Sequence, residues 1–265
     1  MKRLLLELET IVRQIGEELK IRRLDFLGGE KWIGAEVKSR ADEFAHKQIS
    51  FELEKITPGI PILSEERDYS SFEIERPKQY WLIDPIDGTS SFVNGFNGWV
   101  IQVCLVSNNQ PYLAVIYAPD LDIFYSCELG KGAWINGLHI CEIQKSDRLL
   151  VLTDNYPEPR GIAKYIVDSL SNISYLESGS LSLKAMYVLS GKADIFVKNV
   201  VVRDWDFGPP IAFSRLWGGI ITELDGKKFA LTKNITKRGI IVTRNREIHN
   251  EVLRIANKWL YQHAI

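Results

Sequence analysis

Acidic side chains stand at the ends of three apolar segments of this 265-residue sequence. One apolar run leads directly into DPIDGT, residues 84–89, which holds two aspartates. Glu65 and Glu66 end a second run, PILSEE, and Asp206 follows a tryptophan at the expected start of a helix. Mg²⁺ takes about six oxygen ligands and usually keeps several waters, so a few carboxylates and a phosphate oxygen suffice to hold it. The sequence therefore contains the donors of a polymetal site, although spacing alone does not show that they converge.

Other side chains in the sequence offer weaker chemical signals. Gly88 and Thr89 provide backbone N–H groups at a turn, where an anion can bind. Asp42 and His46 are one helical turn apart, which is more typical of a helix-surface contact than of a metal clip. Trp99 is more typical of core packing than of nucleobase stacking. The sequence has no G-x-S-x-G elbow and no P-loop lysine motif, which argues against a serine hydrolase and an NTPase.

The elements that must position these groups follow from hydrophobic periodicity. Apolar residues between Leu5 and Leu19 recur at helical spacing and predict a first helix that ends before Gly28. A second helix is expected from about Ala41 to Ile56, where a Thr-Pro-Gly cluster stops it.

Beyond the second helix the pattern changes to short apolar runs bounded by turns, which predict strands. Asn108-Asn109 is hairpin-like, so this stretch is interpreted as an antiparallel meander. From Leu149 onward strand and helix patterns alternate. We therefore expect an α/β (α+β) chain with an N-terminal part, residues 1–145, which carries most of the acidic cluster, and a C-terminal part, residues 146–265, which supplies Asp206.

Composition bounds the partners and the compartment. The 33 basic and 34 acidic side chains give a net charge of −1, which argues against nucleic-acid or anionic-membrane binding. No apolar run approaches the roughly 18 residues of a spanning helix. The three cysteines form no C-x-x-C pair, and a reduced, cytoplasmic protein is the simplest interpretation. Lys131 and Arg203 could steer an anion, although single exposed charges contribute little.

The motifs LSEE, DPIDGT and WD, in this order and at these intervals, resemble the signature of the inositol monophosphatase superfamily of Mg²⁺-dependent, lithium-sensitive phosphatases. The resemblance extends from about Glu36 to Gly226 and so covers most of the chain. It implies the layered α/β/α/β/α sandwich of the inositol monophosphatase and fructose bisphosphatase type. It also implies a small phosphorylated metabolite as substrate, inhibition by Li⁺ and Ca²⁺, and a homodimer.

Within that superfamily the segments ITPGIPILSEE, YWLIDPIDGT and AVIYAPDLDIFYS are most similar to the CysQ-type 3′(2′),5′-bisphosphate nucleotidases. The sequence departs from that branch at Ser90-Ser91, where Lys-Glu is usual, and it lacks Gly-Pro-Thr ahead of WD. The inositol branch has an acidic ligand for a substrate hydroxyl where this chain has Asn199. Neither specificity is therefore carried over completely.

The resemblance also implies roles for individual residues. Glu65, Asp84 and the Ile86 carbonyl would bind one metal ion, and Asp84, Asp87 and Asp206 a second, with a weaker third ion beside Glu65. A metal-bound water would attack the phosphorus atom in line. By the same resemblance, Glu65 and Thr89 would position and deprotonate the water, and Asp42 would hydrogen-bond to Thr89. The residues that would contact the substrate are Gly88, Thr89, Gly179 and Ser180.

The sequence thus predicts hydrolysis of 3′-phosphoadenosine 5′-phosphate to AMP and phosphate. An inositol-1-monophosphatase or related sugar-phosphate phosphatase is the enzymatic alternative, and fructose 1,6-bisphosphate is a more distant substrate. From a different class, the chain could be a metal- and phosphate-binding regulatory module without turnover.

Overall fold

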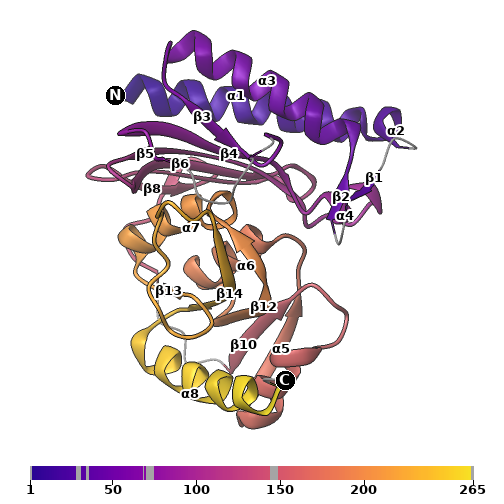
Figure 1. The fold of residues 1–265 in the computed structure, drawn as a ribbon, viewed down its shortest axis with the longest axis vertical. Helices are drawn as coiled ribbons and strands as arrows, with labels where there is room; N and C mark the ends of the chain where they lie inside the picture. The colour runs from indigo at the N-terminus through magenta and orange to yellow at the C-terminus, as the bar shows by residue number, and fades with distance from the viewer. Residues whose placement is uncertain are drawn as a thin grey trace.

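Two β-sheets and three helical layers stack in the order helix, sheet, helix, sheet, helix (Figure 1). The computed structural model describes residues 2–27, 31–33, 36–67, 69, 75–143 and 149–263. Three apolar clusters fill the spaces between the five layers. The α/β class and the layered sandwich expected from the sequence are therefore confirmed.

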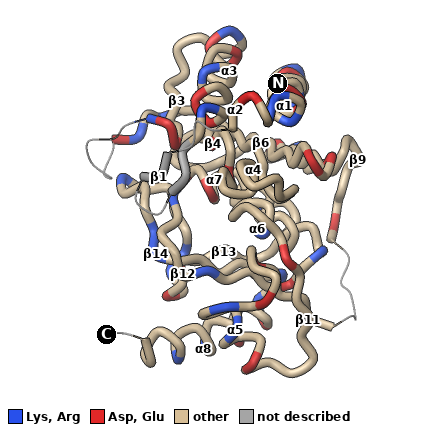
Figure 2. The backbone as a smooth tube through the Cα atoms, turned by 90° about the vertical axis from the view of Figure 1, so that its right-hand side faces the viewer, with Lys and Arg blue, Asp and Glu red and all other residues tan. Residues whose placement is uncertain are grey.

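The first layer covers the outer face of the larger sheet. It consists of α1 (Lys2–Ile21), α2 (Arg23–Phe26) and α3 (Arg40–Ile56). A small hairpin of β1 (Lys31–Ile33) and β2 (Glu36–Lys38) precedes α3 in the chain. Acidic and basic positions are interspersed along α1 and α3 (Figure 2). A capping box at Ser39 starts α3, one residue ahead of the expected start. Gly28, expected just beyond the first helix, lies outside the described residues.

The larger sheet has the strand order β3-β4-β5-β6-β7-β8-β9. Its strands are β3 (Ile62–Ser64), β4 (Gln79–Asp87), β5 (Val100–Ser107), β6 (Gln110–Ala118), β7 (Ile123–Glu128), β8 (Gly132–Ile135) and β9 (Leu138–His139). Asn108 and Asn109 both have positive φ, which confirms the tight hairpin. The meander prediction is wrong for the first pair, because β3 runs parallel to β4. The parallel pairing puts the ends of β3 and β4 at the same edge of the sheet.

Short helical segments connect the strands of this sheet. They are α4 (Thr89–Val93), directly after β4, and the 3₁₀ turn η1 (Pro119–Leu121), directly after β6.

The smaller sheet has the order β11-β10-β12-β14-β13 and mixes parallel with antiparallel pairs. Its strands are β10 (Leu150–Asp154), β11 (Ile173–Glu177), β12 (Ile195–Arg203), β13 (Ile220–Thr222) and β14 (Thr236–Thr243). The helices α6 (Leu181–Leu189) and α7 (Asp204–Trp217) pack between the two sheets, and α5 (Gly161–Ser169) and α8 (Arg246–His263) cover the far face (Figure 1). The expected boundary near residue 145 lies outside the described residues.

The helix α7 contains Phe207-Gly208-Pro209-Pro210 in its interior. The helix begins at Asp204, so the two prolines fall beyond its first turn, where they leave carbonyl groups of the preceding turn without helical donors. A Cβ atom on Gly208 would lie 2.5 Å from a methyl carbon of Leu82. The glycine therefore lets α7 pack directly on β4, the strand that carries Asp84.

Within the described part of the chain, none of the helices is long and apolar enough to cross a membrane. The three cysteines are free, with Cys104 and Cys127 buried and Cys141 exposed.

Candidate active site

At the end of β4, acidic residues of the larger sheet lie beside residues from the C-terminal part of the chain. The pairing of β4 with β5 is regular up to Asp84, which lies opposite Gln102, and then shifts register before Asp87. Such irregularities re-aim side chains at sheet edges. Here the shift brings both aspartates and Ile86 to the same cavity.

One cavity of about 660 Å³ gathers the predicted site residues from both parts of the chain. Of the residues with a predicted role, only Asp42 does not line the cavity. Glu66, which was given no role, does not line it either. The predicted residues that line the cavity are Glu65, Asp84, Ile86, Asp87, Gly88, Thr89, Gly179, Ser180 and Asp206. The fold thus brings together what the sequence left separate.

The carboxylates repel one another in a buried setting. Burial raises the pKa of Asp84 well above its usual range, and the charges of Glu65, Asp87 and Asp206 raise it further. Burial, Asp87 and Glu65 likewise raise the pKa of Asp206. Asp84 Oδ1 is buried and has no hydrogen-bond donor among the residues that the structure describes. A buried carboxylate oxygen without a donor, surrounded by like charges, fits a bound cation.

The carboxylates are nevertheless spaced around the cavity. Among the residues that the structure describes, no three acidic, histidine or cysteine side chains form a ready-made ion cage. Open spacing suits Mg²⁺, which keeps several waters and binds substrate phosphate oxygens as well. The donor set therefore fits a divalent ion that completes its shell from outside the protein.

Asp87 has a second set of partners that the sequence did not reveal. Its carboxylate accepts hydrogen bonds from Leu181 N at 3.1 Å and Ser182 N at 2.7 Å, and from Ser182 Oγ. These bonds lower the pKa of Asp87, although burial raises it by more. Asp87 therefore also fixes the start of α6 against the larger sheet.

Thr89 is held from behind by α3. Its Oγ1 donates to Asp42 Oδ1 at 3.0 Å, and the Ile86 carbonyl lies 3.2 Å away as a second acceptor. Asp42 Oδ2 accepts from Ser39 N at 3.0 Å and Ser39 Oγ at 2.6 Å, which locks the carboxylate in the capping box. The contact between Thr89 and Asp42 that the resemblance implies is thus present, and the catalytic roles of both residues stay predictions.

Comparison with known proteins assigns this arrangement to a family. The model of the inositol monophosphatase family matches residues 8–260. The chain belongs to the inositol monophosphatase family. It is a phosphomonoester hydrolase, which sets aside the regulatory module considered from the sequence.

Individual members of the inositol monophosphatase family resemble the chain over most of its length. It is 30% identical to a fructose-1,6-bisphosphatase/inositol-1-monophosphatase of Thermotoga maritima, over 94% of this chain and 93% of that protein. It is also 30% identical to a 3′(2′),5′-bisphosphate nucleotidase CysQ of Aggregatibacter actinomycetemcomitans, over 74% of this chain and 75% of that one. The solved Thermotoga maritima IMPase superposes with a TM-score of 0.81 at 28% identity, covering 99% of both chains.

This family phosphatase also has cationic and aromatic residues in the cavity that sequence analysis missed. Lys184, Lys198 and Tyr156 line it, together with Arg203. Lys184 is buried, which lowers its pKa to about 7, although Asp154 and Asp87 act in the opposite direction. A lysine inside the apolar helix LSLKAMYVL was the available signal, because a fully buried lysine is rare, and the structure shows its Nζ donating to the Gly179 carbonyl.

Several weaker candidates prove to be structural in the phosphatase. Trp99 is fully buried and donates from Nε1 to Asp120 at 2.7 Å, so it stacks no nucleobase. His46 contacts Ser64 Oγ through Nδ1 at 2.9 Å rather than forming a metal clip with Asp42. Lys131 pairs with Glu128 at 2.8 Å.

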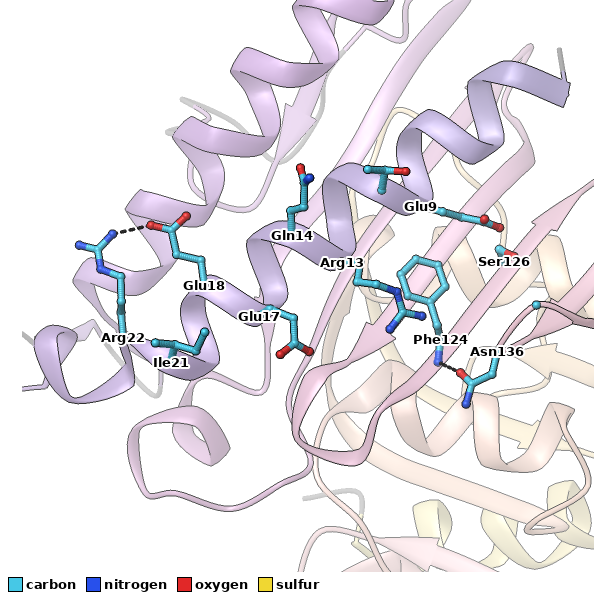
Figure 3. Close-up of a pocket in the computed structure, with 12 residues that line it drawn as sticks. Glu9, Arg13, Gln14, Glu17, Glu18, Ile21, Arg22, Phe124, Ser126 and Asn136 are labelled. Atoms are coloured by element: carbon cyan, nitrogen blue, oxygen red, sulfur yellow. Dashed lines mark hydrogen bonds and ion pairs between the residues drawn. The ribbon is translucent and has the colours of Figure 1, made fainter.

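A larger cavity, of about 820 Å³, lies between α1, the strand β7 and the turn after β8 (Figure 3). Some of its polar groups already have partners: Arg22 pairs with Glu18, and Asn136 accepts from the backbone of Phe124. It contains none of the DPIDGT residues. The carboxylate-lined cavity is therefore the candidate active site.

Proposed function

We propose that this phosphatase hydrolyses a small phosphate monoester that carries a second anionic group, and that 3′-phosphoadenosine 5′-phosphate is the preferred substrate. The observation that carries this proposal is the division of charge in the cavity. Carboxylates gather around the end of β4, whereas Lys198 and Arg203 line the cavity from β12, where Lys198 Nζ also pairs with Asp154 Oδ1 at 2.6 Å. A cationic wall beside a metal site favours a substrate with one phosphate for the metal and another for the cations.

Aromatic and apolar groups in the cavity support a nucleotide. Phe96, 42% exposed, lines it from the loop after α4, and Tyr156 lines it as well, with Lys198 and Arg160 over its ring. Exposed aromatic faces stack with nucleobases. A free sugar ring offers no comparable flat surface, so these residues favour the nucleotide over inositol phosphate.

We propose Mg²⁺ as the cofactor, held by Glu65, Asp84, Asp87, Asp206 and the Ile86 carbonyl. When bound, Mg²⁺ lowers the pKa of water and neutralises the charge that develops on the phosphate. The chain supplies acceptors from three separate elements, so that folding must precede tight binding.

The protein groups around the phosphate have complementary tasks in this proposal. The N–H groups of Gly88 and Thr89 bind phosphate oxygens at the start of α4. Because Thr89 Oγ1 donates to Asp42 Oδ1, its lone pairs can accept a hydrogen bond from the attacking water. As the proton of the water moves to Oγ1, the hydroxyl proton of Thr89 passes to the Asp42 carboxylate. Glu65, at the end of β3, is the second group that orients this water.

Inositol 1-phosphate and fructose 1,6-bisphosphate are the alternative substrates within the family. Inositol 1-phosphate is less favoured, because Asn199 stands at the place of the acidic hydroxyl ligand and does not line the cavity. Fructose 1,6-bisphosphate has two phosphates and fits the cationic wall, and the Thermotoga maritima relative is named for both activities. The free cysteines suit the cytoplasmic location that we propose.

Phosphate release from a panel of 3′-phosphoadenosine 5′-phosphate, inositol 1-phosphate and fructose 1,6-bisphosphate tests the proposal. Specificity is the ratio of the kcat/KM values, measured with Mg²⁺ and with EDTA. We expect the nucleotide to have the largest value and EDTA to abolish turnover. A larger value for inositol 1-phosphate would refute the substrate while leaving the metal site, and turnover in EDTA would refute the metal site.

A further inference from the structure

Gln102 is a buried polar residue that contacts a proposed metal ligand. It lies in β5 directly opposite Asp84, and its Nε2 donates to Asp84 Oδ2 at 3.2 Å. An ionised carboxylate can only accept hydrogen bonds, so the amide nitrogen rather than the oxygen must face it. The cross-strand register therefore fixes this contact.

The position of Gln102 in the sheet is otherwise apolar. Side chains of β5 alternate between faces, and its neighbours on the same face are Val100, Cys104 and Val106, all within the core between the sheets. Gln102 is fully buried, and its Oε1 has no hydrogen-bond partner among the described residues. Burying an amide that is only half satisfied costs stability. An apolar residue would suit this core position better, so stability does not account for the glutamine.

The contact with Gln102 engages one carboxylate oxygen of Asp84 and leaves the other available for a metal ion. Oδ2 accepts from Gln102, whereas Oδ1 is buried and has no donor in the described part of the chain, and the Asp84 side chain lines the cavity. Partners of this kind orient metal-binding carboxylates, and their loss weakens metal affinity.

We propose that Gln102 is a positioning residue that holds Asp84 Oδ2 and thereby leaves Oδ1 to bind the divalent ion. This inference rests on the proposed function, because it takes Asp84 to be a Mg²⁺ ligand. It adds a residue outside the DPIDGT motif, on a neighbouring strand, to the set that determines Mg²⁺ affinity.

The test uses Gln102→Met, which keeps the length of the side chain and removes the donor. Cys104→Val, at the next position on the same face of β5, is the matched control. For each protein, Mg²⁺ binding is measured by calorimetry after EDTA treatment, and the Tm of the metal-free form is measured separately. We expect Gln102→Met to raise the Kd for Mg²⁺ about 10-fold and Cys104→Val to leave the Kd unchanged. The metal-free Tm of Gln102→Met should change little, because the variant removes the unpaired Oε1 but leaves Asp84 Oδ2 without its donor.

A loss of affinity with little change in metal-free stability is the signature of positioning, because a purely structural residue would lose both. An unchanged Kd in Gln102→Met would overturn the inference, and so would a large fall in its metal-free Tm or an equal loss of affinity in Cys104→Val. If the wild-type protein itself bound no Mg²⁺, the proposed metal site would fall, which is a distinct result from a variant that binds as the wild type does.

Discussion

The backbone of Gly98 crosses that of Gly179 at a distance that leaves no room for a side chain. A Cβ atom on Gly179 would lie 2.1 Å from the Gly98 carbonyl oxygen, and Ser180 donates its N–H to that oxygen at 2.6 Å. Gly98 follows α4, whereas Gly179 precedes α6, so this crossing joins the loop beyond DPIDGT to the helix that Asp87 caps.

The crossing predicts that Gly179→Ala inactivates the enzyme. The added methyl group must push the two backbones apart, which moves the amides of Leu181 and Ser182 away from Asp87. We expect a loss of about 1–3 kcal/mol in the free energy of unfolding and a fall in kcat/KM of about tenfold or more. Denaturant unfolding and phosphate release measure the two effects.

Gly59→Ala is the control for this prediction. Unlike Gly179, Gly59 has a positive φ, of 77°, and a Cβ atom there meets nothing within 4 Å. We expect a comparable loss of stability, about 1–2 kcal/mol, from backbone strain alone, with kcat/KM unchanged. Full activity in Gly179→Ala would show that the crossing does not govern the site.

Asp84→Asn should abolish turnover and yet stabilise the metal-free protein. Burial and the neighbouring carboxylates raise the pKa of Asp84 above 3.8, so the folded state binds its proton more tightly than the unfolded chain does. The free energy of unfolding should therefore fall as pH rises from about 4 through the raised pKa. The neutral amide removes this contribution, so the pH dependence of the variant should be flatter.

Unfolding in EDTA at several values between about pH 5 and pH 8 measures this difference. Adding Mg²⁺ should flatten the wild-type profile as well, since the ion replaces the proton on the carboxylates. A variant whose stability changes with pH as steeply as the wild type, or that retains turnover, would contradict the placement of Asp84 at the centre of the charge cluster.

Thr89→Ala should lower kcat far more than it raises KM. The hydroxyl between Asp42 and the cavity is lost, whereas the backbone N–H groups at the start of α4 remain. General-base assistance contributes about 10²–10⁴-fold, and we expect a loss of kcat in that range. Thr89→Ser keeps the hydroxyl and should recover most of the activity, and Ser90→Ala, an exposed neighbour, should change neither constant. Equal losses in the alanine and serine variants at position 89 would argue against a role for the hydroxyl.

Arg76→Met should destabilise the fold. Asp204, at the first position of α7, is fully buried between Arg76 and Lys237. Removing one cation leaves a buried carboxylate with half of its compensation, which costs about 3–5 kcal/mol. Lys164→Met removes an exposed pair with Asp168 and should cost at most about 1 kcal/mol. Chemical denaturation measures the free energy of unfolding of the two variants. Similar small losses would show that the ion pairs of Asp204 contribute little to stability.

Local patterns in the sequence were sufficient for the parts of the structure that depend on nearby residues. Helical spacing of apolar residues predicted α1 and α3, and Asn108-Asn109 predicted the hairpin between β5 and β6, because periodicity and turn chemistry act over a few residues. The motifs in LSEE, DPIDGT and WD predicted the acidic residues of the site through their resemblance to a family. The parallel pairing of β3 with β4 was missed, since either direction of pairing buries the same apolar side chains.

Only the tertiary structure decided which groups meet. Asp87 contacts Ser182 across 95 positions of sequence, and Gln102 meets Asp84 because of the register between two strands. No local pattern encodes such contacts, because they depend on how sheets and helices pack at long range. The sequence therefore determined the layered fold class and the candidate ligands, whereas packing decided that the carboxylates share one cavity and that Lys198 and Arg203 face them there.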